Sequence, residues 1–546
     1  MDFFPDSNRN TKFNHFFWIG LLIIMLMRTF YFGITYFHFL DDYNTYGIFN
    51  RRNYDIFNEI ILRYQLYTFR PIAFLSDAYI TQWFWPNMWL VLLFYTLMHF
   101  VTVYLFYKCL KLVNINFGAF GIIIISLTPI LFEAVYWIGA STRLVSGMFF
   151  SILSSYFLLH HLTLEEKNYH SKRYLILYAI FNFISTGFYE QIIVFNFVFT
   201  CMIIFLIRYK IRTGFKLILS IPFLSTAFIG MFYLLLAPYG KVASRGALVS
   251  PSIEIFEHFR IVTRALNRLL VNVNYEISVK GFYRGMTLIE SPLQWIALII
   301  VIVITIVIFL LLLTNRLNFE HTHQKNYLLC ITIGFILAIS PFMPFYILQN
   351  SFMSPRTIYP AIFGMAIVLD TFLTMISSTI KLHILKAVIS IILIIPFFII
   401  YIAEVNNFKL LEEVDTAVMS NFLEEFENSA IDQKSTIILF NTQYTYADTT
   451  TKSHRLENIT SSDWALIGKA NATSKDFYFR EMKPIQNENL LLKKWAVNEN
   501  GLFGIDEELN VYHLYLRGDT LFIKGTDVAF GTLEYFDDEH FMFVLN

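Results

Sequence analysis

The sequence predicts a polytopic α-helical membrane protein, with about eleven transmembrane helices in residues 1–403 and a soluble α+β domain in residues 404–546. Of the 546 residues, 56% are hydrophobic and 15% are charged, whereas a soluble chain of this length carries more charge. The net charge of zero is unevenly divided. Residues 404–546 hold 24 acidic and 12 basic side chains, and residues 1–403 hold 17 acidic and 29 basic ones. The chain therefore has two physically different parts.

Eleven apolar stretches can cross a bilayer, since about 20 apolar residues span its hydrocarbon core. The polar segment from Met1 to Asn14 and the absence of a small-residue cleavage site make the first stretch a retained helix rather than a signal peptide. The stretches lie near residues 16–37, 88–107, 117–136, 143–161, 173–188, 190–207, 216–237, 292–314, 326–346, 357–378 and 384–403.

The short loops on one side of these helices are all basic, and this sets the orientation. With a cytoplasmic N-terminus, the inner loops carry Lys108 and Lys111, Lys167, Lys172 and Arg173, Arg208, Lys210 and Arg212, Arg316 and Lys325, and Lys381 and Lys386. Eleven crossings then place the C-terminal domain outside the cytoplasm, with two long loops near residues 38–87 and 238–291. Residues 252–270 show helical spacing and are expected to lie flat on the membrane.

The C-terminal domain shows a helical pattern and then short β-like runs. The helix is expected at Phe408–Phe426, and the runs at Ser435–Phe440, Val511–Leu516, Thr520–Lys524 and Phe541–Leu545. Arg517-Gly518-Asp519 is interpreted as a hairpin turn rather than an adhesion motif. Asn458 and Asn471 begin N-glycosylation patterns, which often arise by chance. Because the domain carries no part of the motifs below, we expect it to be dispensable for a reaction step and to serve acceptor choice or assembly.

Two adjacent carboxylates, Asp41 and Asp42, follow the first apolar helix on the outer side. They repel each other and are costly beside lipid, so they serve solvent, a cation or a reaction. A carboxylate beside the hydroxyl of a sugar acceptor can take its proton as the oxygen attacks an anomeric carbon. A solvated helix end is the alternative. The spacing slightly favours Asp42 as the base, since Asp41 is nearer the helix end, but it does not decide between them.

The turn between the third and fourth helices gathers further side chains at the same membrane face. Glu133, Trp137 and Arg143 lie there, within a stretch that begins Thr128-Pro129. This stretch is either part of a site or a helical hairpin whose Pro, Trp and Arg mark the membrane interface.

Other outer turns add charges to this face. Arg356 lies at a helix entry, where it can hold a phosphate through charge-assisted hydrogen bonds or cap the interface. The first outer loop adds Arg70 and Asp77, and Glu190 lies at the turn between the fifth and sixth helices.

Together these motifs resemble the membrane glycosyltransferases of the GT-C class, which are multi-spanning enzymes that use a polyprenyl-phosphate sugar donor. The nearest look-alikes are bacterial and eukaryotic relatives of protein O-mannosyltransferases. The resemblance covers residues 16–380, and its most specific part is the stretch Pro129…Glu133-Ala-Val-Tyr-Trp137…Arg143. Two details differ: Asp41-Asp42 stands where Asp-Glu is commoner, and Ala140-Ser-Thr replaces a turn that usually contains Gly-Arg.

The resemblance implies an inverting transfer on the outer side of the membrane, with an acid of the first outer loop as base. The donor phosphate is then expected at the outer rim, near Arg356 and one of Arg260, Arg264 or Arg268. The acceptor is a glycan, a lipid or a protein of the cell envelope, and the expected location is the bacterial plasma membrane. No cofactor is required, although the acidic pair can also hold a divalent cation.

Several functions are disfavoured. No P-loop or dinucleotide-binding glycine pattern occurs, and nucleic-acid binding is not expected because the soluble domain is acidic. We predict no metal site, since His321 and His323 lie in an inner loop without further ligands.

Two runner-up functions concern lipid-linked glycans. A transporter or flippase needs polar residues throughout the bundle, whereas the spans contain few charges besides Arg28 and Asp370. We expect Arg28 to face the bundle and pair with an acid or a lipid phosphate. A polymerase of lipid-linked glycans should lack the acidic pair after the first helix, and a receptor or scaffold presenting the acidic domain is the third alternative.

Overall fold

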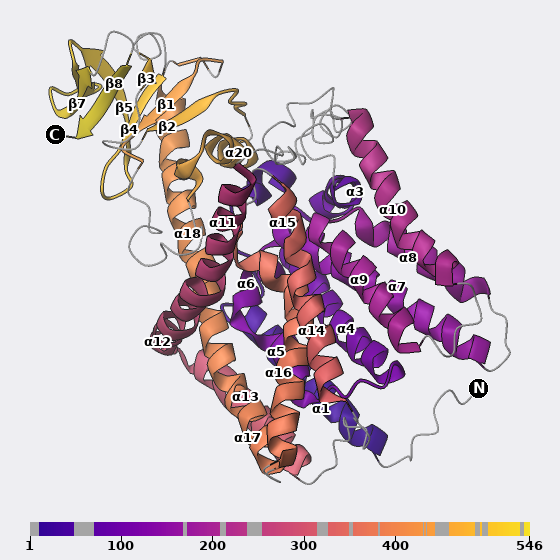
Figure 1. Cartoon of the computed structure of the whole chain (residues 1–546). Helices are drawn as coiled ribbons and strands as arrows, with labels where there is room; N and C mark the ends of the chain where they lie inside the picture. The colour runs from indigo at the N-terminus through magenta and orange to yellow at the C-terminus, as the bar shows by residue number, and fades with distance from the viewer. Residues whose placement is uncertain are drawn as a thin grey trace. The chain divides into compact units, whose positions relative to one another are not determined.

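The computed structural model describes fifteen segments of the chain, which fall into two compact units (Figure 1). The helical unit lies within Met1–Thr35, Phe57–Ser76 and Trp89–Val405, and the sheet unit within Tyr36–Ile56, Asp77–Met88 and Asn406–Asn546. The described residues are 10–47, 70–166, 172–207, 215–236, 254–313, 326–348, 353–379, 383–429, 431–432, 434–442, 458–474, 476–485, 492–493, 501–535 and 540–545.

The helical unit is built from helices, most of which follow the predicted apolar stretches (Figure 1). They are α1 (Asn10–Thr29), α3 (Pro71–Tyr79, which reaches into the sheet unit), α4 (Trp89–Leu112), α5 (Ala119–Leu127), α6 (Phe132–Tyr136), α7 (Ile138–Glu166), α8 (Lys172–Thr186), α9 (Glu190–Ile207), α10 (Phe215–Leu236), α11 (Glu254–Asn267), α12 (Gly281–Thr287), α13 (Pro292–Leu313), α14 (Tyr327–Ile339), α15 (Met343–Ile347), α16 (Tyr359–Thr379), α17 (His383–Ile392) and the first part of α18 (Ile394–Asn428). The expected helix at residues 252–270 is thus confirmed as α11, continued by a π-helical turn at Arg268–Val273.

Seven helices or helix pairs within the described residues are long and apolar enough to cross a membrane by length and composition. An eighth is formed if α5 and the segment Pro129–Tyr136, bent by 41° at Thr128-Pro129, count as one span. The helices at Asn14–Thr29 and Phe215–Met231 are apolar but shorter. The architecture is therefore consistent with a polytopic membrane protein, and the count of eleven crossings stays a prediction.

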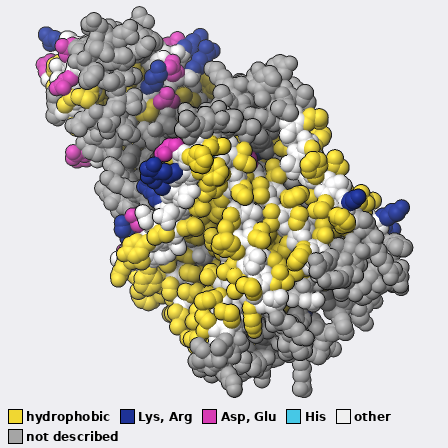
Figure 2. All heavy atoms as spheres, in the orientation of Figure 1, with side chains coloured by type: hydrophobic (Ala, Val, Ile, Leu, Met, Phe, Trp, Pro, Cys, Tyr) yellow, Lys and Arg dark blue, Asp and Glu magenta, His cyan; other side chains and the backbone are white. Residues whose placement is uncertain are grey.

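The outer surface of the helical unit is apolar where a soluble protein would be polar. On α13, Leu293, Ile299 and Leu310 are 73%, 54% and 53% exposed, while Val301 and Ile308 on the opposite side are buried. Figure 2 shows hydrophobic side chains over most of the visible face of this unit. Such a continuous apolar surface is stable against lipid and is costly in water.

Close helix packing in this unit depends on small residues. α14 and α16 lie side by side (Figure 1), and Gly364 faces Ala338 and Gly334 across their contact. A Cβ at Gly364 would collide with the backbone of both neighbours. Glycine lets the two backbones approach, which is how transmembrane helices gain packing where lipid removes the hydrophobic driving force.

The two charges noted in the predicted spans, Arg28 and Asp370, lie at opposite ends of α5. At its N-terminal end the carboxylate of Asp370 accepts hydrogen bonds from the backbone nitrogens of Gly118 (2.9 Å) and Gly121 (3.1 Å). At its C-terminal end the guanidinium of Arg28 donates to the carbonyls of Ser126 (2.7 Å) and Leu127 (2.8 Å). An anion at the N-terminus and a cation at the C-terminus match the helix dipole and satisfy its end groups.

Arg28 therefore faces the bundle as expected, but its partners are backbone carbonyls. Its guanidinium also lies 4.1 Å from the centre of the Tyr401 ring, and the residue is 1% exposed. No local sequence pattern indicates carbonyl partners about one hundred residues away, whereas an acid or a phosphate is the usual partner of a buried arginine.

Replacing Arg28 with Met should destabilise the helical unit. The thioether fills much of the space but cannot donate to the two carbonyls, and each buried unpaired group costs about 1–3 kcal/mol. The thermal unfolding midpoint of the purified protein in detergent should fall clearly. The exposed Arg264 on α11 provides the control, since Arg264→Met should leave the midpoint unchanged. Equal midpoints for both variants would show that Arg28 does not hold the end of α5.

The sheet unit contains an eight-stranded mixed sheet. Its strand order is β2-β1-β4-β5-β6-β7-β8-β3, in which β1 pairs in parallel with β2 and β4 and all other pairs are antiparallel. The strands are β1 (Ile437–Phe440), β2 (Met482–Ile485), β3 (Leu492–Lys493), β4 (Gly501–Ile505), β5 (Val511–Arg517), β6 (Thr520–Ile523), β7 (Ala529–Tyr535) and β8 (His540–Leu545). The four expected β-runs are thus confirmed.

The turn between β5 and β6 is the predicted Gly-Asp hairpin. Arg517 pairs with Thr520 across a two-residue loop, and Gly518 has a φ of 66°, which glycine adopts without strain. One face of the sheet packs a core that includes Phe440, Leu514 and Phe543. The tripeptide is therefore explained by the fold.

Helix α18 covers the other face of β4 and contains the helix expected at Phe408–Phe426. The ring of Phe422 packs edge-on against Phe503 and tilted against Phe479. The ring of Phe426 packs edge-on against Phe479 and tilted against Phe503. The boundary between the two units falls within this helix, after Val405. Helix α20 (Asp463–Thr473) also belongs to the sheet unit.

Candidate functional site

Residues 36–47, which follow α1 and a short connection, are part of the sheet unit, together with residues of the C-terminal domain. A short π-helix, η1 (Tyr43–Gly47), packs directly on α20: a Cβ at Gly468 would lie 3.1 Å from the backbone nitrogen of Asn44. The C-terminal domain therefore supports the segment that carries the acidic pair. The expectation that the domain is dispensable for a reaction step stays a prediction.

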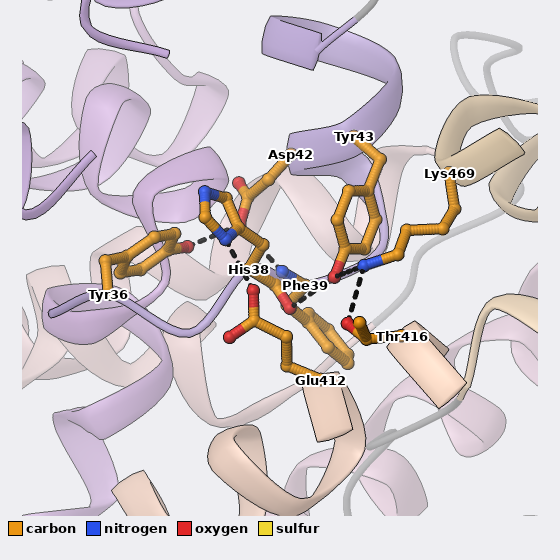
Figure 3. A network of polar contacts seen from close by, with 8 residues as sticks. All are labelled: Tyr36, His38, Phe39, Asp42, Tyr43, Glu412, Thr416 and Lys469. Atoms are coloured by element: carbon orange, nitrogen blue, oxygen red, sulfur yellow. Dashed lines mark hydrogen bonds and ion pairs between the residues drawn. The ribbon is translucent and has the colours of Figure 1, made fainter. Parts of the chain in front are cut away.

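The two members of the acidic pair differ in their surroundings. Asp42 is buried, and its carboxylate accepts hydrogen bonds from the Tyr36 hydroxyl and from the backbone nitrogen of Phe39 (3.0 Å), as Figure 3 shows. Asp41 is half-buried. Leu40, which precedes the acidic pair, has a φ of 30°, and this conformation costs energy for a residue other than glycine. Asp42 thus fixes the turn, and Asp41 is the more accessible carboxylate.

A histidine and a glutamate that no local sequence motif singles out lie next to this turn. His38 Nδ1 is 2.6 Å from Glu412 Oε1 on α18 (Figure 3). Nε2 of His38 is buried, and it has no hydrogen-bond partner among the described residues. A carboxylate on one ring nitrogen fixes the orientation of an imidazole and leaves the other nitrogen to accept or donate a proton.

Aromatic rings surround this imidazole. The ring centres of Trp85, Tyr36 and Tyr43 lie 4.5, 5.2 and 5.9 Å from that of His38. Such rings offer apolar faces to the C–H groups of a ligand, while the hydroxyls of Tyr36 and Tyr43 are already bonded to Asp42 and Lys469.

Lys469 of α20 supplies the positive charge of the network. Its ammonium donates to the Tyr43 hydroxyl (3.0 Å) and to Thr416 Oγ1 (3.1 Å), and it lies 4.1 Å from the centre of the Tyr43 ring (Figure 3). Burial lowers the pKa of Lys469, while Asp415 and Glu412 act against that shift. Burial, with the acids Asp415, Glu412 and Asp42, raises the pKa of Tyr43 well above its usual value, so Tyr43 keeps its proton.

In the helical unit, three predicted site residues come together. Glu133 accepts hydrogen bonds from Ser354 Oγ (3.0 Å) and from the backbone nitrogen of Arg356 (3.3 Å). The Arg356 guanidinium lies 3.4 Å from Glu133 and 4.6 Å from the centre of the Trp137 ring. We call Glu133, Trp137, Ser354 and Arg356 the Arg356 cluster. The side chain of Glu133 is 13% exposed and that of Arg356 is 21% exposed, so a ligand can reach only part of each.

Two of the remaining predicted residues of the helical unit, Arg70 and Glu190, contact each other. Arg70 and Glu190 form a bidentate ion pair, with Arg70 Nε 3.0 Å from Glu190 Oε1, and Arg70 lies over the Tyr189 ring. Arg143 lies in the second turn of α7 and is half-buried. Asp77 belongs to the sheet unit, where the Tyr46 hydroxyl donates to it (2.9 Å).

The basic residues expected near the donor phosphate are exposed on α11 and the π-helical turn after it. Arg260 is 59% exposed and forms an ion pair with Glu257 (3.4 Å), and Arg264 and Arg268 are exposed as well. Phe256, on the same helix, is 82% exposed. A helix with exposed arginines and exposed aromatic rings suits the surface of a membrane.

The prediction about metal ligands concerns residues that the structure describes only in part. His321 and His323 fall in a stretch that the structure does not describe. Within the segments that it does describe, no group of three or more His, Cys, Asp or Glu side chains could hold a metal ion.

In comparisons with known proteins, no family model and no curated sequence matches this chain.

Proposed function

We propose that this protein is an integral membrane glycosyltransferase that moves a sugar from a polyprenyl-phosphate donor to an acceptor outside the cytoplasm. The observation that carries the proposal is the network after α1. There the half-buried Asp41 precedes the buried Asp42 in one turn, and the nearby imidazole of His38, oriented by Glu412, packs against the ring of Trp85. These are the groups that a hydroxyl nucleophile and a sugar ring require.

In this proposal Asp41 is the general base, because it is the more accessible carboxylate of the pair. It takes the proton of the acceptor hydroxyl as that oxygen attacks the anomeric carbon and polyprenyl phosphate departs. Asp42 holds the turn through its bonds with Tyr36 and Phe39. The reaction is a single displacement, so the anomeric configuration inverts.

The Arg356 cluster is proposed to hold the donor phosphate. The side chain of Arg356 is 21% exposed and carries a permanent positive charge on a planar guanidinium, which matches the geometry of a phosphate group. A phosphate would gain charge-assisted hydrogen bonds there, and positive charge favours departure of the anionic leaving group.

The test of the proposal is transfer of labelled sugar from polyprenyl phosphate in membranes that contain the protein. The rate of transfer should fall when Asp41 is replaced with Asn, which removes the carboxylate charge. A protein that binds the donor without transferring the sugar, at full expression and insertion, would contradict the proposal.

A topology measurement tests the placement of the reaction. We expect cysteines introduced at Ser250 and at Lys452 both to react with a membrane-impermeant thiol reagent added from outside intact cells. The native Cys109 and Cys330 are buried and Cys201 is half-buried, so the background should be low. A cysteine at Lys167, in a predicted inner loop, is the negative control. Labelling of only one of the two outer positions would mean that the predicted crossings are miscounted.

A further inference from the structure

A cavity in the sheet unit has a composition that suits an ion. It is small, with room for about one water-sized particle, and it lies between α18, the end of β1, the turn at Ile459–Ser461 and the end of β4. It is lined by Val414, Asp415, Val418, Asn441, Thr442, Asn458, Thr460, Ile505 and Leu509.

Four of the lining residues each have one buried oxygen atom without a hydrogen-bond partner in the described part of the chain. Each of these residues is at most 2% exposed. The atoms are Asp415 Oδ2, Asn441 Oδ1, Thr442 Oγ1 and Asn458 Oδ1. Buried polar atoms without partners cost free energy, so a cluster of four indicates a missing partner that interacts with oxygen.

The orientation of the two amides follows from their other contacts. Asn441 Nδ2 donates to the carbonyl of Ile505 (2.6 Å), and Asn458 Nδ2 donates to Asp415 Oδ1 (3.2 Å). If either amide group were flipped, its oxygen would lie against the carbonyl oxygen of Ile505 or the carboxylate oxygen of Asp415. The unpartnered amide atoms are therefore the carbonyl oxygens.

The carboxylate of Asp415 is only half satisfied. Its Oδ1 accepts from Asn458 Nδ2 and from the backbone nitrogen of Ile459 (3.1 Å), while Oδ2 accepts from none of the described residues. The nearby ammonium of Lys469 donates to Tyr43 and Thr416 instead. Among the described residues, no cationic side chain forms an ion pair with Asp415.

We propose that this cavity binds one hard cation of the Ca²⁺ class, with Asp415, Asn441, Thr442 and Asn458 as its protein ligands. Carboxylate, amide and hydroxyl oxygens are ligands for such an ion, and water can complete the shell in the open part of the cavity. Ca²⁺ fits better than Mg²⁺, which demands a strict octahedron and keeps most of its own water. Three of the four ligands are neutral, so the site contains no cluster of acids and histidines.

This role also accounts for the sequence pattern at Asn458. Both glycosylation patterns lie on buried asparagines: Asn458 and Asn471 are each 1% exposed, and Asn471 Nδ2 donates to the carbonyl of Phe479 (2.9 Å). Neither amide can be reached by a glycosylating enzyme in the folded protein. Asn458 is instead a ligand that brings together the turn at Ile459–Ser461 and α18.

The site is tested by calorimetric titration of Ca²⁺ into the full-length protein in detergent, after treatment with a chelator. The wild-type protein should bind one Ca²⁺ per chain and should bind Mg²⁺ more weakly. Asp415→Asn should lose the binding, and Asp527→Asn, which changes an exposed carboxylate of the same unit, should retain it. Ca²⁺ should also raise the thermal unfolding midpoint of the wild-type protein but not that of Asp415→Asn.

Thr442→Val keeps the side-chain shape and tests the site even if Asp415→Asn fails to fold. It should weaken Ca²⁺ binding while the protein keeps its circular dichroism spectrum. A wild-type protein that binds no Ca²⁺ would show that the cavity holds water only. Unchanged affinity in the folded Thr442→Val variant, or Mg²⁺ binding as tight as that of Ca²⁺, would also overturn the proposal. None of these results depends on glycosyl transfer.

Discussion

Replacing Asp41 with Asn is expected to slow sugar transfer by about 10²–10⁴-fold, the usual loss when a positioned general base is removed. Asn keeps the size of the side chain and most of its hydrogen bonding but cannot take a proton. Asp42→Asn should also reduce the rate, because the buried carboxylate that accepts from Tyr36 and Phe39 holds the turn. The measurement is transfer from a polyprenyl-phosphate sugar in membranes, with expression and insertion checked.

The matched control is Asp519→Asn in the hairpin between β5 and β6. This carboxylate is exposed, so its loss should change the free energy of unfolding by no more than about a few tenths of a kcal/mol. The rate of sugar transfer should stay the same. If the two single variants and the double Asp41/Asp42 variant all turn over normally, the mechanism is wrong. A transporter or scaffold function would then be favoured.

Replacing Arg356 with Gln is expected to weaken donor binding by about 10–150-fold. The estimate takes the loss of a hydrogen bond to a charged group as about 1.5–3 kcal/mol. The effect should appear as a higher KM for the donor, because the phosphate is bound before and during the reaction.

The companion variant Glu133→Gln separates phosphate binding from a structural ion pair. If Arg356 binds the donor phosphate, releasing it from Glu133 should leave donor affinity unchanged or tighten it. If the pair only holds the helix entry, both variants should lower the unfolding midpoint and neither should change the donor KM. The second pattern would remove Arg356 from the site.

Patterns that extend over one helix or one strand could be predicted from the sequence. The apolar stretches at 88–107 and 292–314 became α4 and α13, and the spacing in residues 252–270 became α11. The Gly518-Asp519 turn was also predictable, because the conformational freedom of glycine is a local property. The acidic pair is recognisable from the sequence because two adjacent carboxylates beside an apolar helix are costly.

Contacts between distant segments could not be predicted in the same way. His38 and Glu412 are 374 residues apart, and the ion pair of Arg356 with Glu133 joins two separate helix entries. Nothing in the local sequence distinguishes Glu412 from the other acids of its helix. A single chain also gives no sign that residues 36–47 pack with the C-terminal domain, so the two parts were expected to act separately.

The central claim is that this chain cleaves a polyprenyl-phosphate sugar and passes the sugar to an acceptor. The direct measurement uses the purified full-length protein in lipid nanodiscs with a doubly labelled donor and an envelope extract as the source of acceptors. We predict equal amounts of transferred sugar and released polyprenyl phosphate, and neither product with the Asp41/Asp42 double variant. An intact donor after incubation with well-folded protein, or translocation of uncleaved donor across vesicles that contain the protein, would contradict the claim.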